Sequence, residues 1–540
     1  VLLGRPYVVA DASMNKDIPR LFAETGARVF DMDMFPDAGG EELPWSYASK
    51  IMDTAERIAM TPGTYPVLVT SFMCSPDSFV VPYVRELLEK KGKPYLILEL
   101  DGHGSSVGYG TRVEAAVRSF RNHFAHKGPA VRRDNVVLPP DIVRGNPADI
   151  RGKTLLIPNW DIDVMPLVTA NLRREGIDAR LLEETDELVR QGSRKSDGQC
   201  LPLSVIAREV SHYVTKHRLD PAKTALWMIK SNWSCNIPLY PRHILHLLKQ
   251  EGGGMEKVSI YIDTIGFTGT TPLSLVSTYY AYMFGGLIKR IACRIRPYEI
   301  NPGETDRVLA MARDRLTKVF MGRGDRMDTV KDIVARFESI PVRKETRPKV
   351  AIFGDVYVRD NEVMNQNLIR AIESAGGEVV TMPYSRYAKM IADSHFKRLF
   401  KEKRYKAVAG WKLFLRALKV LEKTYNKLFE TLAGPEEEYN DDTEAILAPY
   451  GVTLEHHGES MENLLKIHYL ADQHDDISLF VQTSPSFCCA GLITEAMRNK
   501  IEEITHIPVV SITYDGTGGD KNSAIVPYLA FPRAQEAKVT

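Results

Sequence analysis

Short apolar runs alternate with longer amphipathic segments along this chain, and the alternation restarts twice. Runs rich in Val, Ile and Leu are typical of buried strands, and the segments between them carry apolar residues at helical spacing. Strands that alternate with helices form βαβ units around a parallel sheet. The sequence therefore predicts an α/β protein with three flavodoxin-like or Rossmann-like parallel-sheet domains. The predicted strands are 7–10, 28–30, 67–72, 95–100, 154–158, 178–182, 226–229, 258–262, 350–354, 477–481 and 509–512, and the predicted helices are 18–25, 46–60, 79–90, 111–124, 165–174, 203–214, 367–374 and 492–504.

A length of 540 residues suits about three domains of roughly 150 residues or a little more. The first is predicted over 1–148, where the proline-containing loop 139–149 ends it. The second covers 149–342, up to a charged hinge, and the third covers 343–540. The third domain contains a predicted helical insertion at about 384–430, in which Lys and Arg alternate with apolar residues. A solvated basic face over a buried stripe explains this composition, and a docking surface for a redox partner is the functional alternative.

The formal net charge is +1, so no overall field favours nucleic acid or an anionic membrane as a partner. No secretory signal or membrane span is visible, and the longest uncharged stretch, 270–288, contains enough Tyr, Ser and Thr to indicate a buried helix. We therefore expect a cytoplasmic protein. Because the chain begins with Val1 inside a strand-like run, we also expect it to be a piece of a longer protein.

Six cysteines in so long a chain do not make a disulfide scaffold, so the thiols are expected to be free, catalytic or metal-bound. Most of them lie between a predicted strand and a predicted helix, where α/β sheets bind ligands and helix N-termini favour thiolates. Such cysteines from several turns could converge on one metal centre, although buried packing is the alternative for each of them. The candidate ligands are Cys74, Cys200, Cys235, Cys488 and Cys489, and Cys293 is interpreted as structural.

The spacing of these cysteines does not identify the metal. Simple iron–sulfur clusters use four thiolates, which ferredoxins supply in tight runs that this chain lacks. Structural zinc sites usually bring paired ligands a few residues apart, and the adjacent pairs Cys488-Cys489 and His456-His457 do not fit that pattern. No Gly-x-x-x-x-Gly-Lys-Ser/Thr phosphate loop occurs, so the chain is not expected to hydrolyse ATP itself.

Several longer stretches resemble motifs of one known family. Together they are similar to the proteins related to 2-hydroxyacyl-CoA dehydratases and benzoyl-CoA reductases. Within that group, the closest similarity is to the activase-related proteins of unknown function and the double-cubane cluster proteins. The resemblance covers nearly the whole chain. The stretches are Ser-Phe-Met-Cys-Ser-Pro-Asp-Ser-Phe at 71–79, Thr-Arg-Val-Glu-Ala at 111–115, Pro-Tyr-Glu-Ile-Asn-Pro-Gly-Glu-Thr-Asp at 297–306, Phe-Cys-Cys-Ala-Gly-Leu-Ile-Thr-Glu-Ala-Met at 487–497, and 513–522.

The resemblance implies an iron–sulfur cluster, either [4Fe-4S] or the double-cubane [8Fe-9S] form, held between α/β domains by the five candidate cysteines. It also implies an ATP-hydrolysing activator with its own [4Fe-4S] cluster, as a separate protein or a fused domain, and a dimer of similar subunits. Five thiols are one short of the six expected for two bridged cubanes, unless Cys293 or a non-cysteine group joins them. The turn at 233–237 departs from the Gly-Pro-Cys-Arg-like pattern, and Gly102 stands where an acidic residue is expected.

The sequence thus predicts an iron–sulfur reductase component that receives low-potential electrons from an ATP-dependent activator and reduces a small or CoA-linked substrate. Dehydration of a 2-hydroxyacyl-CoA ester is the alternative within enzymes. A non-catalytic electron-transfer or scaffold subunit and a metal-free α/β binding protein are the alternatives outside them. No catalytic residue is assigned.

Overall fold

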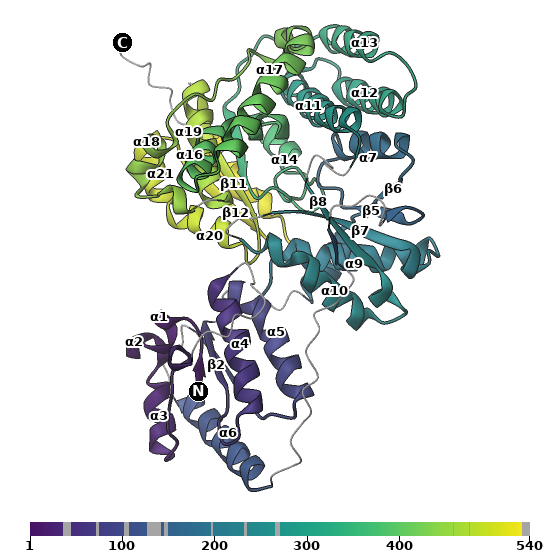
Figure 1. Ribbon diagram of the computed structural model, residues 1–540. Coiled ribbons are helices and arrows are strands. Elements are labelled where there is room, and N and C mark those ends of the chain that lie inside the picture. The colour runs from purple at the N-terminus through teal and green to yellow at the C-terminus, as the bar shows by residue number, and fades with distance from the viewer. Residues whose placement is uncertain are drawn as a thin grey trace. The chain divides into compact units, whose positions relative to one another are not determined.

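The computed structural model describes residues 1–35, 45–71, 75–101, 107–126, 142–144, 150–195, 198–231, 235–264, 270–456, 458–474 and 476–531 (Figure 1). The chain divides into two compact units, one formed by Val1–Pro140 with Ser196–Cys200 and the other by Asp141–Lys195 with Leu201–Thr540. The first unit contains one parallel sheet and the second contains two. The predicted α/β class with several parallel-sheet domains is therefore confirmed, while the finer boundaries at 148 and 342 stay predictions.

The sheet of the first unit consists of β1 (Leu2–Leu3), β2 (Val67–Ser71) and β3 (Leu96–Leu100), in the order β1-β2-β3. An isolated parallel bridge joins Leu2 to Asp31, so a fourth segment lies beside β1. The apolar faces of this sheet are covered by helices, which is why its strands are almost continuously apolar. The helices are α1 (Pro6–Val9), α2 (Ala12–Asn15), α3 (Ile18–Glu24), α4 (Ser46–Met60), α5 (Ser75–Lys90) and α6 (Val107–Ala125).

The predicted strand at 7–10 is wrong, because these residues belong largely to helix α1. Pro6 occupies the first turn of this helix, where its fixed φ angle and missing N–H favour helix initiation. The first strand lies earlier, at β1. The strand predicted at 28–30 does not form either. Next to it, Asp31 makes an isolated bridge to Leu2.

The first sheet of the second unit has the order β4-β8-β7-β5-β6. Its edge strand β4 (Ile142–Arg144) pairs with β8, so the interpretation of 139–149 as a loop is wrong at 142–144. The predicted helix at 165–174 is confirmed as α7. The other strands are β5 (Thr154–Ile157), β6 (Asp178–Leu181), β7 (Thr224–Ile229) and β8 (Ser259–Asp263), and the helices are α7 (Met165–Arg174), α8 (Asp186–Ser193), α9 (Leu201–Lys216), α10 (Tyr240–Glu251), α11 (Pro272–Ile295), α12 (Glu304–Phe320) and α13 (Arg326–Glu338).

The second sheet of this unit has the order β10-β9-β11-β12, with β9 (Lys349–Gly354), β10 (Glu378–Val380), β11 (Ile477–Pro485) and β12 (Val509–Tyr514). The single helix predicted at 492–504 is wrong, because the chain breaks at Met497 into two helices. The helices around this sheet are α14 (Leu368–Ser374), α18 (Thr443–Leu447), α19 (Glu459–Gln473), α20 (Cys489–Ala496), α21 (Arg498–Thr505) and α22 (Val526–Ala530).

The same strand order recurs in all three sheets. When the strands of each sheet are numbered in the order in which they occur along the chain, and β4 is left out, their order across the sheet is 2-1-3-4. In the first unit, the Asp31 segment counts as strand 2 and lies beside β1. This is the order of flavodoxin-like sheets, in which ligands bind beyond the carboxyl ends of the first and third strands. The corresponding pairs are β1 and β2, β5 and β7, and β9 and β11.

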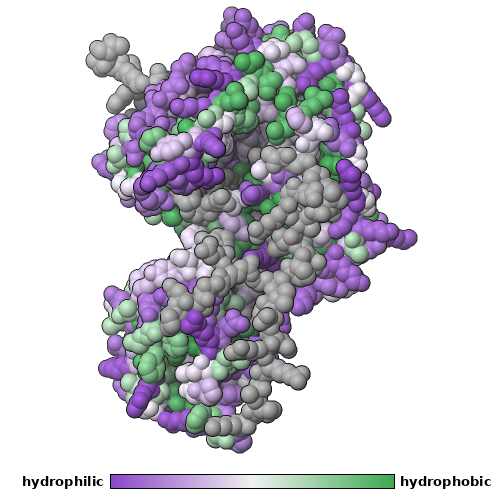
Figure 2. All heavy atoms as spheres, viewed as in Figure 1, coloured by the Kyte–Doolittle hydropathy of each residue, from purple (hydrophilic) through white to green (hydrophobic). Residues whose placement is uncertain are grey.

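The region predicted as a helical insertion contains α15 (Tyr384–Met390), α16 (Ala392–Lys401) and α17 (Tyr405–Ala433). The carboxyl-terminal half of α17 buries Tyr425 and Phe429 against the core. The preceding part of this helix is more exposed, since Leu413 is 69% and Val420 is 71% exposed, although Leu418 is buried. Figure 2 shows hydrophobic residues among hydrophilic ones over this region of the surface. The docking role of the insertion stays a prediction.

Within the described ranges, none of the helices combines the length and apolarity needed to cross a membrane.

Candidate metal centre

The carboxyl ends of β9 and β11 lie side by side, and each leads into a residue that can bind a metal. Asp355 follows β9, and its N–H donates to the Thr483 carbonyl of β11 at 2.9 Å. Gly354 makes this close approach possible, because a Cβ there would lie 2.1 Å from the Thr483 carbonyl oxygen, at a φ of +127°. Cys488 follows β11. The fold therefore places a carboxylate and a thiol at the ligand-binding position of this sheet.

Cys488 caps the amino terminus of α20, and its thiol accepts a hydrogen bond from the Gly491 N–H at 3.3 Å. Residue 491 must be glycine for the helix to approach β11, because a Cβ there would lie 2.6 Å from the Cβ of Ser484. The preceding Phe487 adopts the left-handed region with a φ of +61°, which is uncommon for a bulky residue. This turn therefore holds the Cys488 sulfur in a fixed place beside a backbone donor.

Cys489 is the link to a second cysteine loop. Burial raises the pKa of its thiol to about 11, while the nearby backbone N–H groups of Ala490 and Asn236 oppose that shift. The Asn236 contact brings the loop after β7 onto the Cys488–Cys489 turn, and Cys235 in that loop is buried. Three of the predicted ligands, Cys235, Cys488 and Cys489, thus belong to neighbouring turns of one compact unit.

Two buried carboxylates complete the group. Ligand atoms of Asp355, Glu459 and Cys488 all lie within 4.8 Å of one another. Glu459 begins α19, and its Oε1 accepts a hydrogen bond from the Val356 N–H at 2.6 Å. The sequence analysis missed both carboxylates. The position of Asp355 directly after a predicted strand was a usable signal, whereas nothing local marks Glu459.

The surroundings of this group are charged and buried. Lys466 donates to the Gly354 carbonyl at 3.2 Å, and burial lowers its pKa. Glu462 accepts from the Tyr387 hydroxyl at 2.6 Å, and burial raises its pKa. Burial also raises the pKa of Asp355, and that of Glu459 lies well above its ordinary value because of burial and the nearby Asp355. The Lys466 ammonium acts on all three carboxyl groups, with Arg359 near Asp355 and Arg398 near Glu462, and a bound cation would further favour their ionised forms.

Of the remaining predicted ligands, Cys74 lies outside the described residues. Cys200 is buried and belongs to the short segment that clusters with the first unit, where the Gln199 amide donates to the Ser78 carbonyl at 2.9 Å. Their roles as ligands stay predictions. Cys293 lies in the last turn of α11 in a hydrophobic cluster, and burial raises the pKa of its thiol to about 12.

Cys488 and Cys489 offer thiols, and Asp355 and Glu459 offer carboxylates, that could hold a metal ion here. Thiolates are the usual ligands of iron–sulfur clusters, and N–H donors to the sulfurs tune their potentials. The Gly491 N–H, which donates to the Cys488 sulfur, is of this kind. With its pKa raised to about 11, the partly buried Cys489 thiol would remain protonated at neutral pH unless a metal ion or another cation stabilised the thiolate.

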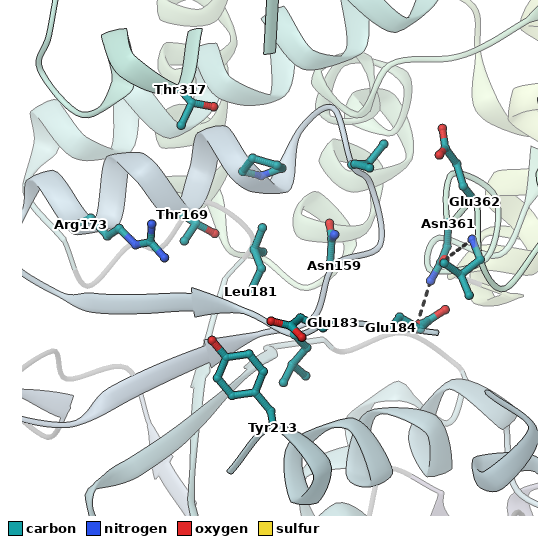
Figure 3. Close-up of a pocket in the computed structure, with 14 residues that line it drawn as sticks. Asn159, Thr169, Arg173, Leu181, Glu183, Glu184, Tyr213, Thr317, Asn361 and Glu362 are labelled. Atoms are coloured by element: carbon teal, nitrogen blue, oxygen red, sulfur yellow. Dashed lines mark hydrogen bonds between the residues drawn. The ribbon is translucent and has the colours of Figure 1, made fainter. Parts of the chain in front are cut away.

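A pocket of about 510 Å³ lies elsewhere in the second unit, beyond the carboxyl ends of β5 and β6 (Figure 3). Glu184 in its wall accepts hydrogen bonds from the Tyr357 hydroxyl at 2.9 Å and the Asn361 amide at 3.1 Å. Burial raises the pKa of Glu184 to about 7. The buried Glu209 interacts with it electrostatically, and within the described part of the chain neither of its oxygens has a hydrogen-bond partner. The pair therefore retains a proton near neutral pH.

A buried ion-pair network lies close to the carboxyl end of β5. The Lys289 ammonium contacts Asp161 at 2.9 Å and Asp360 at 3.2 Å, and Asp360 also pairs with Arg359 at 2.6 Å. Lys289 comes from α11, so the network ties this long helix to two sheets of the second unit. These charges are neutralised by their partners, which gives this end of the sheet a structural role.

Comparison of the chain with protein-family models found no match, and comparison with curated proteins found none either.

Proposed function

We propose that the chain binds an iron–sulfur centre through Cys235, Cys488 and Cys489, with Cys74 and Cys200 as further ligands. The observation that carries this proposal is the position of the Asn236 backbone beside the Cys489 thiol, where it opposes the rise of the thiol's pKa, because this brings together two predicted cysteine loops from different sheets. The burial of Cys235 and Cys488 adds support, since a buried cluster is protected from solvent and its potential is set by the protein.

The proposed activity is that of a reductase component. The centre would receive electrons one at a time from an ATP-hydrolysing activator, present as a separate protein or a fused domain, and would pass them to a small or CoA-linked substrate. When bound, the cluster supplies one-electron chemistry. This chain's own residues would then ligate the metal, donate N–H groups to its sulfurs, and keep water from it. The absence of a phosphate-loop sequence agrees with ATP hydrolysis by another polypeptide or domain.

Anaerobic purification of the full chain, with iron and acid-labile sulfide assays, tests this proposal. About four irons per chain would indicate a [4Fe-4S] cluster and about eight the double-cubane form. The reduced protein should give an EPR signal. The proposal would be overturned if the protein held far less than one equivalent of iron and of sulfide per chain, both after purification and after reconstitution.

The reaction is tested separately. A reductase consumes reductant in proportion to product, whereas a dehydratase turns over a 2-hydroxyacyl-CoA ester without net consumption of reductant. An electron-transfer subunit would keep its cluster and reduce another protein, but would reduce no small substrate.

A further inference from the structure

The two buried carboxylates beside Cys488 are oriented by hydrogen bonds that use one oxygen of each. Asp355 Oδ1 accepts from the N–H groups of Tyr357 and Val358, both at 2.9 Å. Glu459 Oε1 accepts from the Val356 N–H at 2.6 Å. Among the described residues, the second oxygen of each side chain accepts no hydrogen bond. Each carboxylate is therefore held in place with one acceptor atom left over.

Glu459 is the carboxylate that lies near both thiols. One of its oxygens is within 4.8 Å of the ligand atoms of Cys488 and Asp355. It also interacts electrostatically with the Cys489 thiol. In Asp355, in contrast, one oxygen accepts hydrogen bonds from two backbone N–H groups, which stabilises the turn after β9. Metal–oxygen and metal–sulfur bonds of about 2.0–2.3 Å allow one ion to reach groups at this spacing.

We propose that the Glu459 carboxylate is a direct ligand of the metal centre beside the Cys488 thiolate, and that Asp355 positions the turn that carries both. The inference rests on the proposed function for the identity of the metal, since it assumes iron. The choice of Glu459 rests on its position within 4.8 Å of the Cys488 ligand atom together with its interaction with the Cys489 thiol. Carboxylate oxygen is a poorer match than sulfur for a soft metal site. A carboxylate ligand is therefore the one that such a centre exchanges most readily.

Glu459→Gln is the sharpest variant. The amide carbonyl of Gln can still accept from the Val356 N–H, while the charged second oxygen is lost. Glu462→Gln is the matched control, because Glu462 is buried one turn along the same helix and bonds to the Tyr387 hydroxyl. Glu459→Asp is the second variant, since it keeps the charge and shortens the side chain by one methylene. Urea unfolding of each metal-free variant shows whether it folds.

The full chain and these variants are reconstituted anaerobically with iron and sulfide and compared by X-ray absorption, EPR and iron loss to a chelator. Wild type and Glu462→Gln should show an oxygen neighbour of iron in addition to sulfur. Glu459→Gln should lose that neighbour, change the EPR signal, and release iron at least tenfold faster, and Glu459→Asp should release iron faster as well. Iron-loaded Glu459→Gln with the wild-type spectrum and release rate would overturn the inference and leave the proposed cluster intact.

A titration of the metal-free chain with Co²⁺ separates the two proposals. If wild type takes up no iron, the proposed function fails, but Co²⁺ should still bind and give a thiolate charge-transfer band. Glu459→Gln should then weaken Co²⁺ binding at least tenfold relative to Glu462→Gln. Equal Co²⁺ affinities in these two variants, or no Co²⁺ binding by wild type, would overturn the inference.

Discussion

The backbone N–H of Asn236 lies beside the thiol of Cys489 and opposes the rise of its pKa. The two residues follow the third strands of two different sheets, β7 and β11. Flavodoxin-like sheets place their binding sites at the carboxyl ends of such strands. The recurrence of one strand order therefore explains how cysteines far apart in the sequence come to lie together in the second unit.

The close contact between α20 and β11 gives a first prediction. Gly491→Ala should lower the free energy of unfolding by about 1–3 kcal/mol, because its Cβ would lie 2.6 Å from the Ser484 Cβ and force the helix away from the strand. Urea unfolding of the metal-free chain measures this effect.

Gly410→Ala is the matched control for that variant. Gly410 lies in α17, and a Cβ there meets no atom within 4 Å. Because alanine favours helix over glycine, this change should raise the free energy of unfolding by up to about 1 kcal/mol. Equal effects of the two substitutions would contradict the steric account.

The network around Lys289 gives a second prediction. Lys289→Met removes a buried ammonium from Asp161 and Asp360, and should lower the free energy of unfolding by about 3–5 kcal/mol. The exposed ion pair of Lys318 with Asp314, at 2.6 Å, serves for comparison. Lys318→Met should change the stability by less than about 1 kcal/mol. Comparable losses in both variants would show that burial is not what makes the network important.

The Glu184 carboxyl gives a prediction about pH. Its pKa is raised to about 7 in the folded chain because of burial, so between its ordinary value and about 7 the folded chain keeps a proton that the unfolded chain releases. The free energy of unfolding should therefore fall as the pH rises through this window, by roughly 1–3 kcal/mol. Glu184→Gln should reduce that fall.

Denaturant unfolding at pH 5 and pH 8 measures this difference, with Glu430→Gln as the control because Glu430 is exposed on α17. An unchanged pH dependence in Glu184→Gln would mean that another buried acid, such as Glu209, is responsible.

Much of the fold follows from the sequence because local patterns determine it. The helix 46–60 shows its helical periodicity and the strand 67–71 its continuous apolar run within a few residues. The errors arise where a local feature overrides composition. Pro6 starts a helix inside an apolar run that otherwise favours a strand. The short strand β4 has no strong pattern of its own and forms by pairing with β8.

The candidate site was only partly predictable for a different reason. The position of cysteines after strands is visible in the sequence, and it indicates which sheet edge each one approaches. The approach of Glu459 to Asp355 and Cys488 depends on how α19 lies against β9, which is a tertiary contact without a local signature. Glu459 follows a glycine at the start of a helix, and many surface helices begin in that way.

The iron and sulfide content of single cysteine variants tests the central claim most directly, namely that the Cys235 loop and the Cys488–Cys489 turn hold one centre. Cys235→Ala and Cys489→Ala should each lower both contents to less than half of the wild-type values, because each removes a ligand from the same cluster. Cys293→Ala should leave them unchanged, since this thiol is packed in a hydrophobic cluster. Wild-type contents in Cys235→Ala would contradict the account.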